Sequence, residues 1–276
     1  LILTDTFQSW EEGDQLDSTV FVQNNARLER LKALDIQVIV GNPPYSSGQD
    51  SANDDNANES YPTLDAAIRD TYAARSAATN KNSLYDSYIR AIRWASLRIA
   101  ERGVVAFVTN GGWLDSNTAD GMRLCLANEF SDIHILNLRG NQRTAGEQSR
   151  KEGGKVFGGG SRATVAVTIL VKDPNHSGAA RIHYTDIGDY LTREDKLARI
   201  ETAERVSGLE LPTLITPNPD GDWLNHRRDD FGAFLALGDK RDPLDSIFYT
   251  HDNPLPTARD ARVSDSSTTT ISSSPL

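Results

Sequence analysis

The chain has 276 residues, of which 38 % are hydrophobic and 25 % are charged, as in an ordinary globular α/β protein. Its formal net charge of −10 argues against a protein that binds nucleic acid through overall charge, so any DNA contact needs a local basic patch. No apolar run reaches the roughly 18 residues of a membrane-spanning helix. The single cysteine, Cys125, fits a core position, and its isolation favours a reducing, cytoplasmic setting.

Apolar runs and helical repeats alternate along most of the chain. The pattern predicts helices at 63–75, 83–103 and 118–130, with Ser83 and Asp86 capping the second. Strand-length apolar runs occupy 1–7, 33–41, 103–110, 132–140, 162–173 and 180–188. Strands that alternate with helices and are apolar throughout predict an α/β fold with a mostly parallel sheet, covered on both faces.

Asn42, Pro43, Pro44 and Tyr45 directly follow an apolar run, where a strand should end. Proline has a fixed φ and no N–H, and it pushes the preceding residue out of the helical region, so this segment predicts a stiff turn. The turn presents two acceptors, the Asn42 side-chain carbonyl and the Pro43 main-chain carbonyl. A planar exocyclic amine can donate both hydrogens to them, while Tyr45 offers a flat face for stacking the attached ring.

The predicted turn suits methyl transfer to an amino group. Holding both hydrogens on one side pulls the nitrogen toward tetrahedral geometry and frees its lone pair to attack the methyl group of S-adenosylmethionine in line. Within duplex DNA such an amine is paired, so the base must be flipped into the pocket. The alternative is that two prolines only form a rigid turn, but the strand before and the polar loop after favour the amino-methyltransferase interpretation.

Longer segments accompany this motif: "LTDTF", "VIVGNPPYS", "NSLYDSYIRAIRWAS", "GVVAFVTNGGWLDSNTADGMR", "NLRGNQRTAGEQSRKEGGKVFGGGSR" and "DWLNHRRDDFGAFLALGDK". Across roughly residues 1–260 they resemble the methyltransferase segment of type ISP restriction–modification enzymes, single-chain proteins similar to helicase-linked adenine methyltransferases. The resemblance implies site-specific methylation of the 6-amino group of adenine in double-stranded DNA, with S-adenosylmethionine as cofactor. It also implies a nuclease and an ATP-driven translocase before this segment and a target-recognition region after it.

The resemblance also assigns roles to individual residues. The catalytic motif of the family falls on four consecutive positions, Asn42, Pro43, Pro44 and Tyr45. Asp5 falls where related enzymes place a polar residue near the adenine of the cofactor, although capping a turn after a strand is an equally good role for it.

The same resemblance sets the expected fold and domains. The glycine-rich turn and the acidic residue that bind the cofactor should precede Leu1, so we expect a Rossmann-like methyltransferase sheet truncated at its amino terminus. The isolated fragment is then expected to be inactive. Residues 1–205 would be a partial catalytic domain and 206–250 a connector, with 251–276 either the start of the target-recognition region or a disordered, truncated tail.

A glycine-rich segment between two predicted strands carries a local excess of positive charge. Two acidic residues, Glu147 and Glu152, face six basic ones: Arg139, Arg143, Arg150, Lys151, Lys155 and Arg162. We predict that these six contact DNA phosphates, and a solvated loop is the alternative.

Other polar residues give weaker signals. Asn110 could line the site, whereas Trp113 is expected to pack in the core. The five histidines have no metal-ligand spacing, so no metal is predicted, and His134 is expected to be a partly buried strand residue: His134, His176, His183, His226 and His251.

Two alternatives to DNA methylation stay open. A methyltransferase of this motif class could act on a protein glutamine or on ribosomal RNA, although the long polar insertion after Gly48 and the basic segment weigh against this. A catalytically dead scaffold or DNA-docking piece is the other alternative, and cofactor binding by the chain would reject it.

Overall fold

The computed structural model describes residues 4–11, 21–44, 60–157, 162–209 and 212–227, together with positions 234, 235, 244 and 247. Its contacts divide the chain into two units, Leu1–His226 and Arg227–Leu276, and every element named below lies in the first. Within the described ranges, no helix has both the length and the apolar character needed to span a membrane.

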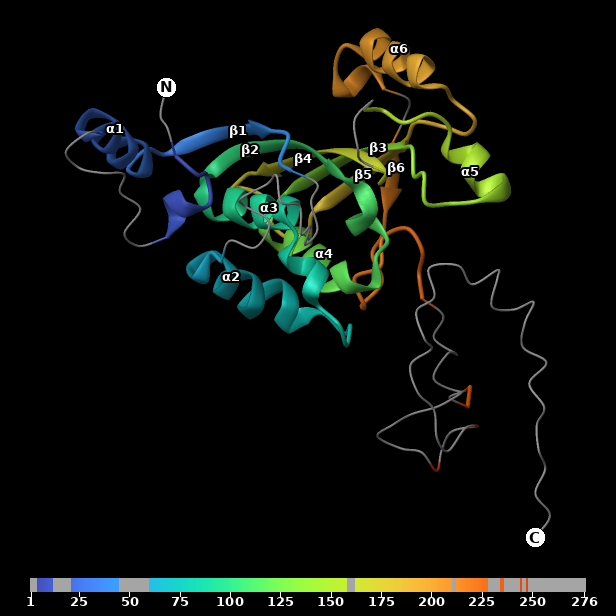
Figure 1. The fold of residues 1–276 in the computed structure, drawn as a ribbon, viewed down its shortest axis with the longest axis horizontal. Helices are drawn as coiled ribbons and strands as arrows, with labels where there is room; N and C mark the ends of the chain where they lie inside the picture. Colours follow the sequence, from blue (N-terminus) through green and yellow to red (C-terminus); the bar gives the residue numbers. More distant parts are fainter. Residues whose placement is uncertain are drawn as a thin grey trace, which may run out of the picture. The chain divides into compact units, whose positions relative to one another are not determined.

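The first unit is built on a six-stranded sheet with the order β1-β2-β4-β3-β5-β6 (Figure 1). Its strands are β1 (Ile36–Gly41), β2 (Ile99–Asn110), β3 (Asp132–Arg139), β4 (Val165–Lys172), β5 (Arg181–Asp186) and β6 (Thr213–Ile215). Neighbours β1 and β2 are parallel, as are β3 and β5, whereas the other three pairs are antiparallel. The expectation of a mostly parallel sheet is therefore wrong.

The reversal comes from β4, which enters between β2 and β3 and runs against both. An antiparallel neighbour needs no crossover helix, so the chain can turn back through residues 140–164. A strand buried on both faces has the same apolar composition in either direction, which is why the sequence pattern did not reveal the reversal.

The helices of this unit are α1 (Val22–Lys32), α2 (Pro62–Ile68), α3 (Ser87–Arg98), α4 (Asp120–Glu129), α5 (Gly146–Glu152) and α6 (Arg193–Ala203). Helices α2, α3 and α4 agree with the three predicted ones, with shifted ends, whereas α1, α5 and α6 were not predicted. A π-helical turn, Arg69–Ala73, extends α2. The predicted cap is wrong: Ser83 lies in a 3-10 turn, and Asp86 is the N-cap of α3 without a capping side-chain hydrogen bond.

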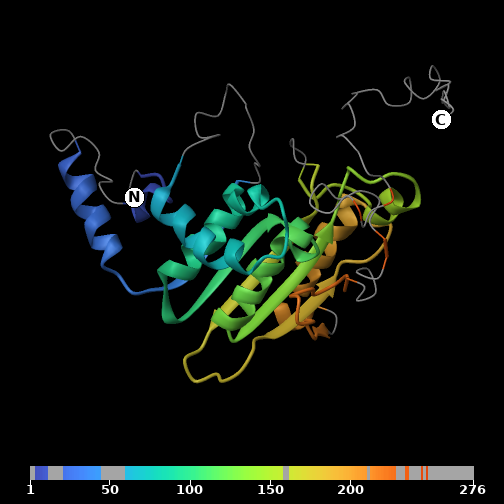
Figure 2. The same cartoon turned by 90° about the horizontal axis from the view of Figure 1, so that it is seen from below.

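The sheet has helices on both sides. Figure 1 shows α2, α3 and α4 below the sheet and α6 above it, and Figure 2 shows α2, α3 and α4 lying across the strands. The buried face of α3 repeats at helical spacing, which packs it on the sheet: Tyr88, Ile89, Ala91, Ile92 and Ala95.

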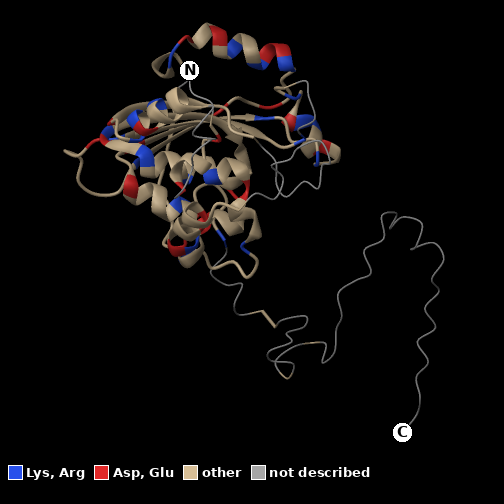
Figure 3. Cartoon of the chain, turned by 60° about the vertical axis from the view of Figure 1, so that its left-hand side comes forward, with Lys and Arg blue, Asp and Glu red and all other residues tan. Residues whose placement is uncertain are grey.

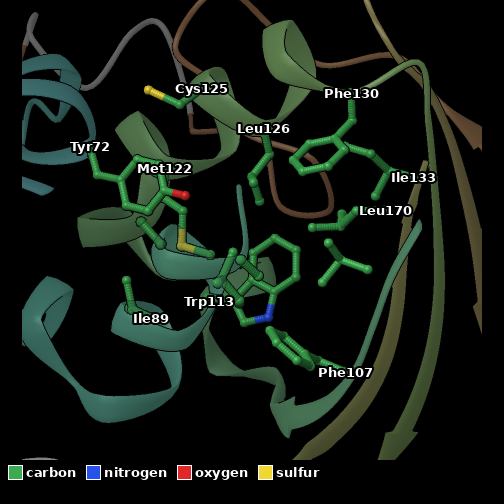
Figure 4. Packing of buried hydrophobic residues seen from close by; sticks show 14 of the residues in the cluster. Tyr72, Ile89, Phe107, Trp113, Met122, Cys125, Leu126, Phe130, Ile133 and Leu170 are labelled. Atoms are coloured by element: carbon green, nitrogen blue, oxygen red, sulfur yellow. The ribbon is translucent and has the colours of Figure 1, made fainter. Parts of the chain in front are cut away.

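The main core lies between the sheet and α4. Trp113 is fully buried and contacts Trp223 edge-on, with 5.5 Å between ring centroids. Figure 4 shows Trp113 between Leu126 of α4 and Phe107 of β2. Cys125 is buried in the same core cluster, so the predicted core positions of Cys125 and Trp113 are confirmed. Full burial of one such large side chain stabilises the fold by roughly 1.5–3 kcal/mol.

A buried arginine attaches residues 218–223 to this core. The Arg123 guanidinium is 1 % exposed and donates to the main-chain oxygens of Gly221 (2.6 Å), Trp113 (2.7 Å) and Ser116 (2.9 Å). It also forms an ion pair with Asp222 at 3.4 Å. Because these bonds pin the chain beyond β6 to α4, residues up to His226 pack within the first unit.

Candidate active site

The Asn42-Pro43-Pro44 segment leaves the sheet at the carboxyl end of β1. Gly41, the last residue of β1, pairs with Phe107 of β2, and a Cβ at Gly41 would lie only 3.0 Å from the Phe107 ring. Glycine therefore lets this strand end pack closely on the ring. Asn42 and Pro44 are exposed and Pro43 is half-buried, and none of the three is helical. Tyr45 lies outside the described residues.

The neighbouring strand ends in a capped turn. The Asn110 side-chain oxygen accepts a hydrogen bond from the Gly112 N–H (2.9 Å) and caps the 3-10 turn Gly111–Leu114. Because β1 and β2 are parallel, their carboxyl ends share one edge of the sheet, so Asn42 and Asn110 both lie at that edge. The observed role of Asn110 is local, since it fixes the turn that buries Trp113.

Asp5 caps a turn in this structure. One carboxylate oxygen accepts from the Phe7 N–H (2.8 Å) and the Gln8 N–H (3.5 Å), and the other accepts from the Tyr61 hydroxyl (2.7 Å). Residues 4–7 form a turn before a 3-10 helix (Gln8–Trp10) and not the predicted strand, while residues 1–3 lie outside the described part. The turn-capping alternative therefore describes the observed contacts, and a cofactor contact by Asp5 stays a prediction.

A second carboxylate holds the same segment in place. Glu11 is buried and accepts from the Thr63 N–H (2.8 Å) and the Leu64 N–H (3.0 Å) at the start of α2. Backbone N–H groups in the first turn of a helix lack partners within the helix, so the carboxylate satisfies them. Glu11 and Asp5 thus join residues 4–11 to residues 61–64, at the far end of the polar insertion that begins after the proline turn.

Arg139, the first of the six predicted DNA-binding residues, faces carboxylates. Its side chain is 20 % exposed, pairs with Asp186 at 2.7 Å and also donates to Asp189. These residues line a polar cavity of about 540 Å³ beside the carboxyl ends of β3 and β5, together with Lys151 and Glu152. Four acidic side chains and two basic ones line this cavity, so the guanidinium of Arg139 has carboxylate partners within its own unit.

The remaining basic residues surround a short helix that sequence reasoning missed. Arg143, Arg150 and Arg162 are exposed, whereas Lys151 and Lys155 are half-buried. Arg150 and Lys151 lie in the last turn of α5, and the exposed Arg150 pairs with Glu147 at 3.3 Å. Figure 3 shows acidic and basic residues interspersed along the described ribbon. This segment therefore has a local excess of basic residues and not a uniformly basic face.

A buried lysine fixes this basic segment. The Lys196 ammonium of α6 donates to the main-chain oxygens of Glu152 and Gly154, both at 2.8 Å, and burial lowers the pKa of this lysine. Gly153 has a φ of +68° and packs directly on the Leu191 carbonyl, so no larger residue fits there. The glycines at this point serve close backbone packing.

Three solved structures are similar to this chain over most of its length. A nuclease-deletion mutant of the type ISP restriction–modification enzyme LlaGI, in complex with a DNA substrate mimic, has a TM-score of 0.79, 47 % identity and coverage of 87 % of this chain. The ATP-dependent type ISP enzyme LlaBIII, bound to DNA, has a TM-score of 0.80, 42 % identity and coverage of 87 %. The DrdV–DNA complex has a TM-score of 0.75, 35 % identity and coverage of 88 %.

This chain spans only part of each relative, 19 % of LlaGI, 16 % of LlaBIII and 23 % of DrdV. No protein-family model and no curated protein matches it. The mixed six-stranded sheet and these similarities confirm the predicted Rossmann-like methyltransferase fold class.

Proposed function

Because this chain is homologous to part of the type ISP restriction–modification enzymes, we propose that it belongs to the methyltransferase segment of such an enzyme. The reaction is transfer of a methyl group to the 6-amino group of a flipped adenine in DNA. The observation that carries the proposal is the position of the Asn42-Pro43-Pro44 segment at the carboxyl end of β1, beside the parallel strand β2.

The proposed chemistry uses acceptors rather than a general base. The Asn42 side-chain oxygen and the Pro43 main-chain oxygen accept the two hydrogens of the adenine amine. This arrangement draws the nitrogen toward tetrahedral geometry and directs its lone pair outward. Tyr45 stacks on the flipped base, Pro44 keeps the turn rigid, and the product loses its proton after the transfer.

S-adenosylmethionine is the proposed methyl donor, and it supplies an electrophilic methyl group. Among the described residues, only Asp5 was predicted to contact it, and both oxygens of that carboxylate accept hydrogen bonds within the protein. The described residues therefore do not by themselves make a fitting cofactor site, and we assign no contact between this chain and the cofactor.

Duplex DNA is the proposed substrate because the relatives LlaGI, LlaBIII and DrdV are described in complexes with DNA or a DNA substrate mimic. Lys155 and the exposed Arg143, Arg150 and Arg162, with Lys151, are proposed to contact phosphates, and Arg139 contributes less because carboxylates hold it. The whole protein would add a nuclease and translocase before this segment and a target-recognition region after it, and it would act in the cytoplasm.

Replacement of Asn42 tests the proposed role of the turn. In the protein that contains this chain, Asn42→Ala should lower the rate of DNA methylation by about 100-fold or more, because the turn then offers only one of its two acceptors. DNA affinity should stay within about twofold, since the substitution removes no phosphate contact.

Asn175→Ala is the matched control. Asn175 follows β4, whose end lies at the opposite edge of the sheet from Asn42, and its side chain is exposed. Methylation should be unchanged in this control. Methylation by Asn42→Ala that stays close to the rate of the control would be incompatible with the proposed mechanism.

A further inference from the structure

Two histidines lie side by side on the parallel strands β3 and β5. The register places His134 opposite His183 and Asp132 opposite Arg181. Alternate residues of a strand point to the same face, so these four side chains share one face of the sheet. Both histidines line a cavity of about 200 Å³ together with residues of α6, which covers this face.

The two imidazoles are stacked closely. Their ring centroids are 4.5 Å apart and their planes differ by 9°. A neutral imidazole has a nitrogen lone pair, which is the form that coordinates a metal ion.

Asp132 adds an oxygen to this pair. The His183 Nε2 atom is 3.6 Å from the Asp132 Oδ1 atom, and one donor atom of each of the three residues lies within 4.8 Å of the others. In a tetrahedral zinc site with bonds of roughly 2.0–2.2 Å, ligand atoms are separated by about 3.3 Å. Binding a metal ion therefore requires both rings to turn out of the observed stacked arrangement, so that their lone pairs meet at one point.

We propose that Asp132, His134 and His183 form a Zn²⁺ site with three protein ligands and a fourth position open to water. The ion would join β3 to β5 at the start of these strands, opposite the edge that carries Asn42, so it takes no part in the proposed methyl transfer. Asp132 and His134 lie two residues apart in β3, whereas His183 is distant in the chain and only the strand register brings it beside them.

Arg181 competes with the metal for the same carboxylate. Its Nε atom is 2.7 Å and its Nη2 atom 2.9 Å from the two Asp132 oxygens. The Arg181 side chain is 63 % exposed, so releasing it to water costs little.

The competition predicts substitutions with opposite effects. The untagged 276-residue chain, first stripped of metal with a chelator, would be titrated with Zn²⁺ by calorimetry. The unsubstituted chain should bind one equivalent. His183→Ala and Asp132→Asn should weaken binding by roughly tenfold or more, whereas Arg181→Met should tighten it several-fold, because the carboxylate is freed.

His176→Ala is the matched control, since His176 is a half-buried histidine of the β4–β5 connection and its ring lies against the Ala179 carbonyl. The affinity of His176→Ala for Zn²⁺ should equal that of the unsubstituted chain. Absence of Zn²⁺ binding by the unsubstituted chain, or unchanged binding by His183→Ala, would overturn the proposal. Unchanged or weaker binding by Arg181→Met would also overturn it, and this variant keeps all three ligands if His183→Ala fails to fold.

Discussion

At the scale of single residues, buried charges in this protein satisfy backbone groups that would otherwise lack partners. Arg123 donates to three main-chain oxygens, Lys196 donates to two, and Glu11 accepts from two N–H groups at the start of α2. Each side chain holds a loop or turn against a regular element. Removal of one member of a buried ion pair such as Arg123 and Asp222 typically costs about 3–5 kcal/mol, because the other charge is left buried.

Asp86 gives a pH-dependent prediction. Burial raises the pKa of its carboxyl from 3.8 to about 6, against the opposing effect of Arg90. Because the pKa is higher in the folded state, the ionised carboxyl destabilises the fold progressively as pH rises between those two values. Asp86→Asn keeps a good N-cap residue and should stabilise the fold, with a gain larger by on the order of 1 kcal/mol at about pH 7.5 than at about pH 5, since partial exposure weakens the effect.

Urea unfolding of the unsubstituted protein and of Asp86→Asn at the two pH values measures the gain in the free energy of unfolding. Asp70→Asn is a suitable control, because Asp70 is exposed and forms an ion pair with Arg69 in the π-helical turn. The stability change caused by this substitution should show no comparable rise with pH. A gain from Asp86→Asn that is equal at the two pH values, or smaller at the higher one, would contradict the prediction.

At the scale of elements, the predictions succeeded where buried residues recur at the spacing of a helix or form the apolar run of a strand. The helices of the core and the five longest strands were predicted from their apolar residues, and most of these elements bury a stripe or both faces, although β1 leaves Val38 and Val40 exposed. The helices α1, α5 and α6 were missed, and each has at most one residue in the buried class. The sequence did hold one signal that could have predicted α6, the Thr192–Asp195 capping box at its start.

Tertiary contacts decided the remaining elements. Strand β6 and Trp223 fall within a turn-rich stretch predicted to be a connector, where β6 pairs with β5 and the Arg123 contacts hold the residues next to Trp223. In the candidate site too, the local sequence predicts some features and tertiary contacts decide the others. The sequence predicts where the proline turn lies, but the carboxylate partners of Arg139 come from β5 and the residues after it, which no local pattern reveals.

Gly121 gives a prediction about helix packing. A Cβ on this residue of α4 would lie 2.5 Å from the Ser76 nitrogen and would also overlap the Tyr72 carbonyl. Gly121→Ala should therefore destabilise the fold by about 1–3 kcal/mol, although alanine favours an isolated helix. Asn128→Ala, at an exposed position of the same helix, should change the free energy of unfolding by no more than about 0.5 kcal/mol.

Chemical denaturation of both variants distinguishes packing from helix propensity. If propensity dominated, Gly121→Ala would be the more stable protein. That result would show that α4 can move away from the residues after α2 at no cost.

At the scale of the whole molecule, charge is unevenly distributed. The chain has a net charge of −10, yet six basic residues and only two acidic ones lie between 139 and 162. Lys196 of α6 donates to the main chain of this segment at Glu152 and Gly154, and the Gln142 N–H donates to the Arg162 carbonyl (2.9 Å) within it. A fixed basic segment loses less conformational entropy on binding DNA than an unstructured one of the same charge.

Neutralising this segment should weaken DNA binding in a salt-dependent way. The triple variant Arg143→Ala, Arg150→Ala, Lys151→Ala should lower DNA affinity and reduce the slope of log affinity against log salt by about 1 for each phosphate that the protein no longer neutralises. Arg102→Ala is the control, because Arg102 is exposed near the start of β2, at the opposite edge of the sheet. If the triple variant has the same salt slope as the control, the segment is a solvated loop that does not contact DNA phosphates.

The central claim, that the Asn42-Pro43-Pro44 turn presents an adenine amine for methylation, is tested most directly by identifying the methylated atom. The protein that contains this chain would be incubated with duplex DNA and S-adenosylmethionine labelled in its methyl group, and the DNA digested to nucleosides for mass spectrometry. We predict that the label appears on the 6-amino nitrogen of deoxyadenosine. Label on carbon 5 of cytosine, or on protein with none on DNA, would contradict the account.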